Sequence, residues 1–192
     1  MMAGAVGAYV GVLLVATLVD NFFPLFILEV VLLIGFHVVK HKPCINLMVM
    51  FAFVFMTGLR LAPLLSRTLG MSGGGAIIGN AFAMTSVIFG AMSFYAIKTT
   101  KDFSGYGKPF MIARVVIIVF SVISIFMGSP LMSILISGAV VVLFSILVTY
   151  DTQNIIKGLY ETPIDGAIAL YLDFLNIFTA LLHLFGIFGS DE

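Results

Sequence analysis

Residues 130–148, with the sequence PLMSILISGAVVVLFSILV, form a run of 19 residues that contains no charged side chain. A helix needs about 20 predominantly apolar residues to cross the hydrocarbon core of a bilayer. Ser129 and Pro130 open the run with the residue types of a helix N-cap and of a first helical position. The hydrophobicity fades near Val148, but no helix breaker follows before Gly158. The stretch therefore predicts one membrane-spanning helix.

The rest of the chain repeats this pattern of apolar blocks separated by short polar segments. The other blocks cover about residues 3–19, 24–39, 45–65, 76–97, 109–127 and 163–188. Seven helices of about 20 residues use ~140 of the 192 residues and leave only loops and short tails. We therefore expect an all-α integral membrane protein, with a single seven-helix transmembrane domain over residues 1–192. The first block is too long, and too weakly basic in front, for a cleaved signal peptide, so we expect it to be retained.

The composition agrees with a chain whose solvent is lipid. Hydrophobic residues make up 61% of the sequence and charged residues 9%, against roughly 45–50% and about 25% in soluble domains. The zero net charge and the lack of a long basic run argue against nucleic acid as a partner. Cys44 is the single cysteine, which excludes an internal disulfide and a zinc site built from cysteines. No hydrolase motif is present in the sequence, and we expect neither an enzyme nor a bound cofactor.

Lysine and arginine in the loops predict the orientation of the helices, because cytoplasmic loops carry an excess of these residues. One set of loops carries six lysines, namely Lys40, Lys42, Lys98, Lys101, Lys108 and Lys157. The loops on the opposite side carry Arg67 alone. We therefore expect the lysine-rich loops and the N-terminus in the cytoplasm, and the C-terminus outside.

Two aspartates stand inside the last two blocks, although an ionised group at the bilayer centre costs at least ~2.5–3.5 kcal/mol. Asp151 lies roughly 9 Å and Asp173 roughly 15 Å from the cytoplasmic ends of their helices, at the helical rise per residue. The short connection predicts antiparallel neighbours with both carboxylates at similar depth. If they lie within a few ångströms they would share one proton, as a pH sensor, a cation site or both. The alternative is two separate carboxylates, each paired with a lysine or capping a backbone group.

The last block carries a stripe of small and polar residues. Asp173, Asn176, Ala180 and His183 fall within one arc of a helix with 3.6 residues per turn. Such a stripe is typical of a helix at the centre of a bundle or along a pathway, so Asn176 and His183 are pathway candidates. Taken alone, His183 is more typical of an interior histidine held by a hydrogen bond than of a ligand.

Three charged residues in other blocks have more than one interpretation. Glu29 lies about one turn inside the second block, where it either pairs with Arg60 or faces an outer vestibule. Both residues are kept as pathway candidates. Arg60 and Arg114 stand near the ends of their blocks, and we expect their side chains simply to extend to the membrane surface.

Four motifs resemble the transmembrane Bax inhibitor-1 motif family, and the resemblance covers essentially the whole chain. They are TGLRLAP at 57–63, TTKDFS at 99–104, YDTQNI at 150–155 and LYLDFLNIF at 170–178. The last two, at this separation, are the most specific. The stretch ILEV at 27–30 is similar to the second helix of bacterial calcium-leak members of the YetJ type.

The resemblance implies six helices around a central seventh, and the plasma membrane of a bacterium. Bacterial members pass calcium passively and in a pH-dependent way, and their paired aspartates correspond to Asp151 and Asp173. A basic residue at the cytoplasmic end of the second helix latches the sixth-helix aspartate in the closed state. The matching position is Lys40, where the family example carries arginine, and lysine lacks arginine's planar fork. Members usually have a polar tail before the first helix, whereas this chain begins inside it.

Two classes of function follow from these observations. In the first, Asp151 and Asp173 form the inner gate of a cation leak: deprotonation leaves them negative, and calcium moves down its gradient. A calcium/proton exchanger would need the same pair. In the second, the protein is a non-conducting regulator that binds a membrane protease or a stress-pathway partner. The acidic pair and the polar stripe favour conduction, with the lipid bilayer and calcium ions as partners.

Overall fold

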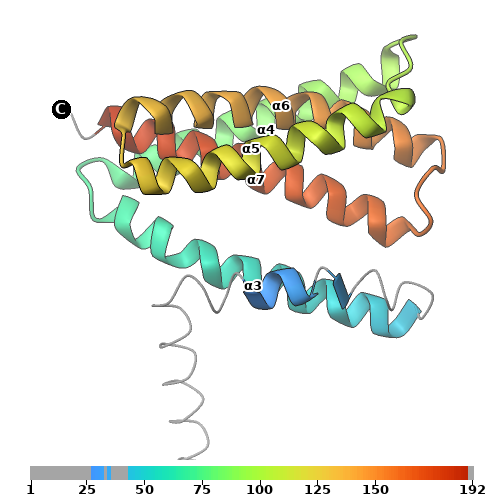
Figure 1. The fold of residues 1–192 in the computed structure, drawn as a ribbon, viewed down its shortest axis with the longest axis horizontal. Coiled ribbons are helices and arrows are strands. Elements are labelled where there is room, and N and C mark those ends of the chain that lie inside the picture. The colour runs from blue at the N-terminus through green and yellow to red at the C-terminus, as the bar shows by residue number, and fades with distance from the viewer. Residues whose placement is uncertain (1–26, 33, 36–42, 190–192) are drawn as a thin grey trace, which may run out of the picture. The chain divides into compact units, whose positions relative to one another are not determined.

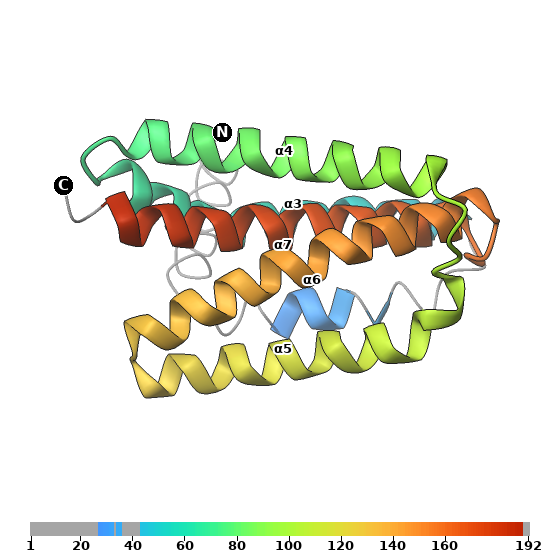
Figure 2. The ribbon, with the colours of Figure 1, turned by 90° about the horizontal axis from the view of Figure 1, so that it is seen from above.

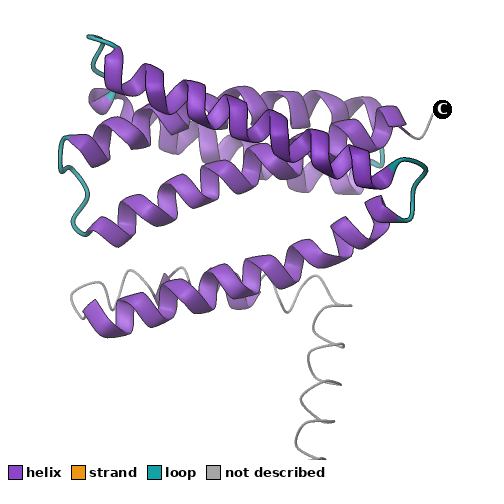
Figure 3. Cartoon of the chain, turned by 180° about the vertical axis from the view of Figure 1, so that it is seen from behind, coloured by secondary structure: helices purple, strands orange, loops and turns teal. Residues whose placement is uncertain are grey.

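The computed structural model describes residues 27–32, 34–35 and 43–189 (Figure 1). Over this part of the chain every regular element is a helix, and Figure 3 shows the long helices joined by loops. The chain divides into two compact units, Met1–Gly70 and Met71–Glu192, and each is described by itself. The expected helix at 3–19 lies outside the described residues.

In the first unit, the described part of the second apolar block is helical. Helix α3 follows at Pro43–Leu69, slightly longer than the predicted block at 45–65. A hydroxyl group inside this apolar helix bonds to the helix's own backbone, since Thr57 Oγ1 donates to the Phe53 carbonyl at 3.2 Å. Such bonds satisfy polar groups where lipid offers no partner.

The described part of the second unit contains four long helices and one short 3-10 helix. Their bounds are Gly74–Lys98 for α4, Ser104–Tyr106 for the 3-10 helix η1, Gly107–Met127 for α5, Pro130–Ile156 for α6 and Pro163–Gly189 for α7. Helix α6 packs against α4, α5 and α7, and α7 also packs against α4. Figure 2 shows α6 crossing between α5 and the other two helices. The predicted helices in this part of the chain are therefore confirmed.

Local signals in the sequence explain the ends of α6. Ser129 caps the helix: its side chain accepts a hydrogen bond from the Met132 N–H, and Pro130 takes the first helical turn. The helix continues past Val148 and ends before Gly158, whose φ of 65° lies in the left-handed region that suits glycine. The predicted start signal is confirmed, and the helix runs beyond the point at which hydrophobicity fades.

Helix α7 begins with a reciprocal cap. The Thr162 N–H donates to Asp165 Oδ2 at 2.8 Å, and the Asp165 N–H donates to Thr162 Oγ1 at 3.2 Å. Both backbone donors would otherwise lack a partner in the first turn of the helix. This cap closes the turn between α6 and α7.

Five stretches of the described chain are long and apolar enough to cross a membrane, one for each of α3 to α7. Within the second unit, Leu147 of α6 and Ile177 of α7 are fully buried. Phe174 packs edge-to-face against Phe82 and Phe89 of α4, with ring centroids 5.8 and 5.6 Å apart, as expected of a packing residue. The arrangement of six helices around a seventh, and the single domain, stay predictions because they involve both units.

Candidate functional site

Two aspartates on neighbouring helices converge on one arginine. Asp151 of α6 and Asp173 of α7 are buried, with 0% and 1% of their surface exposed. One nitrogen of Arg114, Nη2, lies 2.7 Å from Asp151 Oδ2 and 3.5 Å from Asp173 Oδ1. One oxygen of each carboxylate therefore lies within 3.5 Å of the same nitrogen atom. The predicted proximity of the two carboxylates is confirmed; their role as a pH sensor stays a prediction.

The packing of three helices brings these groups together. Helices α6 and α7 are antiparallel neighbours, so residues near the end of one lie beside residues in the first half of the other. Helix α5 packs on α6, and Arg114 lies roughly 10 Å along α5 from its start at the helical rise per residue. That depth matches the depth of Asp151 on α6, which explains why the guanidinium reaches the pair.

The two carboxylates differ in their hydrogen bonds. Asp151 accepts one bond from Arg114 on Oδ2 and one from the Tyr160 hydroxyl on Oδ1, each at 2.7 Å. Neither oxygen of Asp173 accepts a hydrogen bond from any residue that the structure describes. Burial and the neighbouring charge of Asp151 raise the pKa of Tyr160, so its hydroxyl keeps its proton and donates. Asp151 is thus held by two hydrogen bonds, whereas Asp173 interacts with Arg114 through charge alone.

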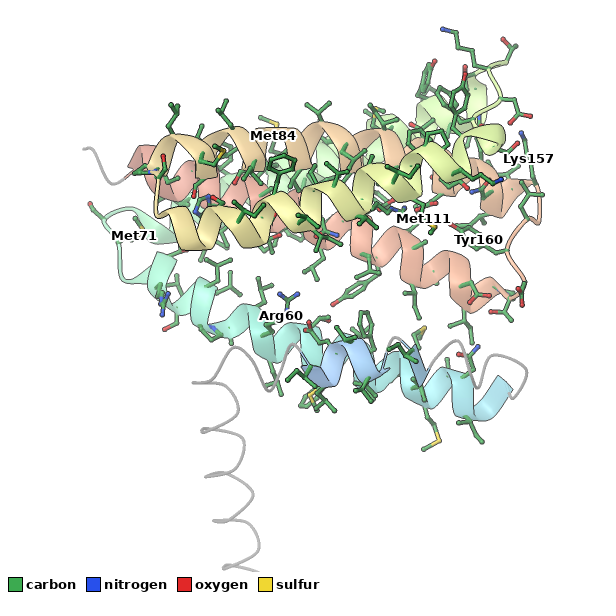
Figure 4. The ribbon with its side chains drawn as sticks, viewed as in Figure 1. Arg60, Met71, Met84, Met111, Lys157 and Tyr160 are labelled. Carbon is green, nitrogen blue, oxygen red and sulfur yellow. The ribbon has the colours of Figure 1, made fainter. Side chains whose placement is uncertain are left out.

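A cavity of about 460 Å³ adjoins the pair. It is lined by Ser104, Gly107, Phe110, Met111, Arg114, Tyr150, Asp151, Asn154, Leu159 and Tyr160. In Figure 4, Met111 of α5 and Tyr160 lie at the same end of the second unit as Lys157. Asn154 is only 5% exposed, and its Oδ1 has no hydrogen-bond partner among the described residues. A residue of the cavity wall thus has a buried neutral oxygen without a hydrogen-bond donor.

The loop between α4 and α5 is anchored to α6 two residues beyond Asp151. Gln153 Nε2 donates to the Lys101 carbonyl at 2.8 Å, and Gln153 Oε1 accepts from the Phe103 N–H at 2.9 Å. Lys157 of the same turn pairs with Asp102. The hydrogen bond from Lys157, with further bonds from Ser104, lowers the pKa of the Asp102 carboxyl below its usual range. The motifs at 99–104 and 150–155 therefore form one connected structure.

The other pathway candidates on α7 form local hydrogen bonds. Asn176 Nδ2 donates to the Leu172 carbonyl one turn earlier, at 2.7 Å. His183 Nδ1 lies 3.1 Å from the Ser137 hydroxyl of α6. The prediction that His183 is an interior histidine held by a hydrogen bond is confirmed. A role of either residue in a pathway stays a prediction.

The first unit contains an ion pair of its own. Glu29 is 6% exposed, and its oxygens lie 2.8 and 2.7 Å from Arg60 Nε. Of the two interpretations of Glu29, the pair with Arg60 is therefore the one that the structure shows. The expectation that Arg60 simply extends to the membrane surface is wrong, because its nitrogen is held by a buried carboxylate. Lys40 lies outside the described residues, and its proposed contact with Asp151 stays a prediction.

Arg114 is the functional residue that the sequence reasoning missed. We expected its side chain to extend to the membrane surface, and this is wrong because it turns inward to the two aspartates. The physical reason is that a buried acidic pair attracts a cation more strongly than the headgroup region attracts a single arginine. The depth of Arg114 in its helix could have indicated this contact, since Arg114 and Asp151 are similarly far from the same end of neighbouring helices.

The donor set at the pair is small. Within the described residues, no group of three or more histidine, cysteine, aspartate or glutamate residues is placed to hold a metal ion. The two carboxylates alone would give calcium fewer than the six to eight oxygens that it prefers, so water or backbone oxygens would complete its shell. This suits an ion in transit better than a permanently bound one.

Apolar helices of membrane-spanning length that bury two aspartates beside one arginine define a polytopic helical membrane protein with a charged site among its helices. Residues 1–190 match the family described as "Inhibitor of apoptosis-promoting Bax1". The chain belongs to this Bax inhibitor-1 family.

Several bacterial proteins are similar to this chain. A protein of Helicobacter pylori is 43% identical over 192 residues, covering all of this chain and 83% of its own length. A Campylobacter jejuni protein is 43% identical over 194 residues, covering 99% of this chain and 84% of its own length. A Vibrio cholerae relative, named as a membrane protein, is 32% identical over 142 residues, covering 74% of this chain and 64% of its own length.

Proposed function

We propose that the protein is a pH-sensitive passive leak pathway for calcium, with Asp151 and Asp173 as its gate. The observation that carries the proposal is the meeting of two buried carboxylates, from neighbouring helices, at one guanidinium. A buried net charge in a membrane is costly, so it is retained where an ion or a proton has to be handled. The proposal includes the YetJ-type subtype, with the lysine-rich loops on the cytoplasmic side of a bacterial plasma membrane.

The charges of the site account for the pH dependence. With one proton on the pair, the positive charge of Arg114 balances the remaining carboxylate, and the site is neutral. When that proton leaves, the site carries one net negative charge and attracts a cation. A rise in pH on the side that the pair faces therefore favours calcium passage, and acidification opposes it.

Calcium flux through the purified protein in proteoliposomes tests this function. We expect the signal of a calcium-sensitive dye to rise with pH between roughly pH 6 and 8, as the pair loses its shared proton. Asp151→Asn and Asp173→Asn should each remove most of that dependence. Asp165→Asn, which changes the carboxylate of the α7 cap, is the matched control and should keep it. Wild-type pH profiles in both gate variants would overturn the gate.

The same vesicles separate the alternatives. Calcium accumulation against its gradient after a pH step would show a calcium/proton exchanger, which uses the same acidic pair. No flux at any pH, from protein that is folded and inserted, would contradict conduction and leave the non-conducting regulator. For that role, the next measurement is co-purification with a membrane protease from native membranes.

A further inference from the structure

We propose that Arg114 is a tethered counter-cation: it occupies the position between Asp151 and Asp173 that a permeating divalent cation takes, and it withdraws toward Asn154 when that cation enters. This inference rests on the proposed function, since it names the residue that competes with the permeant ion. It assigns this competition to α5, independently of the contact proposed for Lys40.

The position of Arg114 is the first step of the argument. Its Nη2 lies between Asp151 Oδ2 and Asp173 Oδ1, at 2.7 and 3.5 Å. Calcium binds carboxylate oxygens at about 2.3–2.6 Å, so an ion that contacts both carboxylates has to occupy the space that this nitrogen fills. The guanidinium and the ion therefore exclude each other.

The charges are the second step. The guanidinium offsets only one of two ionised carboxylates, whereas a divalent cation offsets both. Asp173 is the weaker partner of Arg114, since neither of its oxygens accepts a hydrogen bond from the described residues although it is 1% exposed. A buried carboxylate oxygen without a donor is costly, and a metal ion would remove that cost.

The third step is a place for the displaced side chain. The Arg114 side chain is 34% exposed and borders the 460 Å³ cavity, which is large compared with the roughly 30 Å³ of a water molecule. Asn154 lines the same cavity, and its buried Oδ1 lacks a hydrogen-bond partner among the described residues. Arg114 Nε is a buried donor that likewise has none there. Rotation toward Asn154 would satisfy both groups.

Equilibrium binding of radioactive calcium to the detergent-solubilised protein tests the competition. Arg114→Gln removes the charge and should bind calcium at least about tenfold more tightly than the wild type. Arg114→Gln combined with Asp173→Asn should lose that gain. Lys108→Gln, which removes an exposed positive charge from the same helix, is the matched control and should bind as the wild type. Equal affinity of wild type and Arg114→Gln would overturn the proposal.

Arg114→Lys keeps the test decisive if Arg114→Gln does not fold. A lysine keeps the charge, but its side chain is one atom shorter, so its nitrogen competes less well for the position between the carboxylates and calcium affinity should rise about two- to fivefold. An affinity equal to that of the wild type would again overturn the proposal.

Asn154→Leu tests the withdrawal. In the wild-type background it should weaken calcium binding severalfold, because the displaced guanidinium loses its acceptor. In the Arg114→Gln background it should change nothing, and an equal effect in both backgrounds would contradict the role of Asn154. Binding is measured without a membrane or a gradient, so it is independent of flux. Tight calcium binding by Arg114→Gln, together with no flux through the wild type, would contradict the leak function but not this inference.

Discussion

At the scale of single residues, the unequal hydrogen bonding of the two buried aspartates has measurable effects. Asp151 holds Arg114 and Tyr160, whereas Asp173 accepts no hydrogen bond from the described residues. Removing a partner from a satisfied buried pair leaves a charge uncompensated, but removing an unsatisfied carboxylate takes away a cost. The two conservative substitutions should therefore differ in stability.

Asp151→Asn should lower the free energy of unfolding by about 1–3 kcal/mol, less than for a fully buried pair because Arg114 is one-third exposed. Asp173→Asn should be as stable as the wild type or more stable. Thermal unfolding in detergent at neutral pH measures both. Equal losses in the two variants would contradict the asymmetry.

Tyr160→Phe isolates one bond of the site. The hydroxyl at 2.7 Å from Asp151 Oδ1 is lost while the ring stays, so stability should fall by about 1 kcal/mol. Tyr106→Phe is a control for the loss of a tyrosine hydroxyl at a 53% exposed position of the same unit. Thermal unfolding gives the comparison, and no difference between the two variants would speak against the bond.

At the scale of elements, the close approach of α6 and α7 at their turn depends on Gly166. A Cβ there would lie 2.6 Å from Ile155 Cγ1 and 3.2 Å from Tyr160 Cδ2. Gly166→Ala should therefore displace these side chains and cost about 1–3 kcal/mol. Gly186→Ala in the same helix meets no atom within 4 Å and should be neutral or slightly stabilising. Urea or thermal unfolding measures both variants, and equal stability would contradict the close approach of the two helices at Gly166.

The loop between α4 and α5 has its own pH signature. The bond from Lys157 lowers the pKa of Asp102, so its stabilising effect is present above the ordinary aspartate value of about 3.9. That effect is lost as the pH falls through the lower pKa of the folded state. In Lys157→Met the Asp102 pKa should return toward about 3.9, as measured by carboxyl NMR titration. In Lys101→Met it should stay low, and an unchanged titration in Lys157→Met would exclude the pairing.

At the scale of the whole molecule, loop charge predicts which side each loop faces. A cysteine introduced at Gly105 in a Cys44→Ser background should be labelled by a membrane-impermeant reagent only after the cells are opened. A cysteine at Ser72, between α3 and α4, should be labelled in intact cells. The reverse pattern would invert the orientation.

Periodic and compositional signals predict the helices well, because lipid forces every apolar run of this length to satisfy its own backbone. The caps at Ser129 and Thr162 were predictable from residue type alone. The proximity of Asp151 and Asp173 was predictable because the turn between their helices is short. The partner Arg114 was not predicted, because helix packing across 37 positions of sequence decides its contact and no local pattern records that packing. The anchoring role of Gln153 was missed for the same reason.

The anchoring of the α4–α5 loop by Gln153 joins the loop to the acidic pair mechanically. The Gln153 side chain, two residues from Asp151, bonds to the backbone of Ala96 at the end of α4 and of Lys101 and Phe103 in the loop. We therefore expect a partner that binds residues 101–103 to act, through Gln153, on the same turn of α6 that carries Asp151.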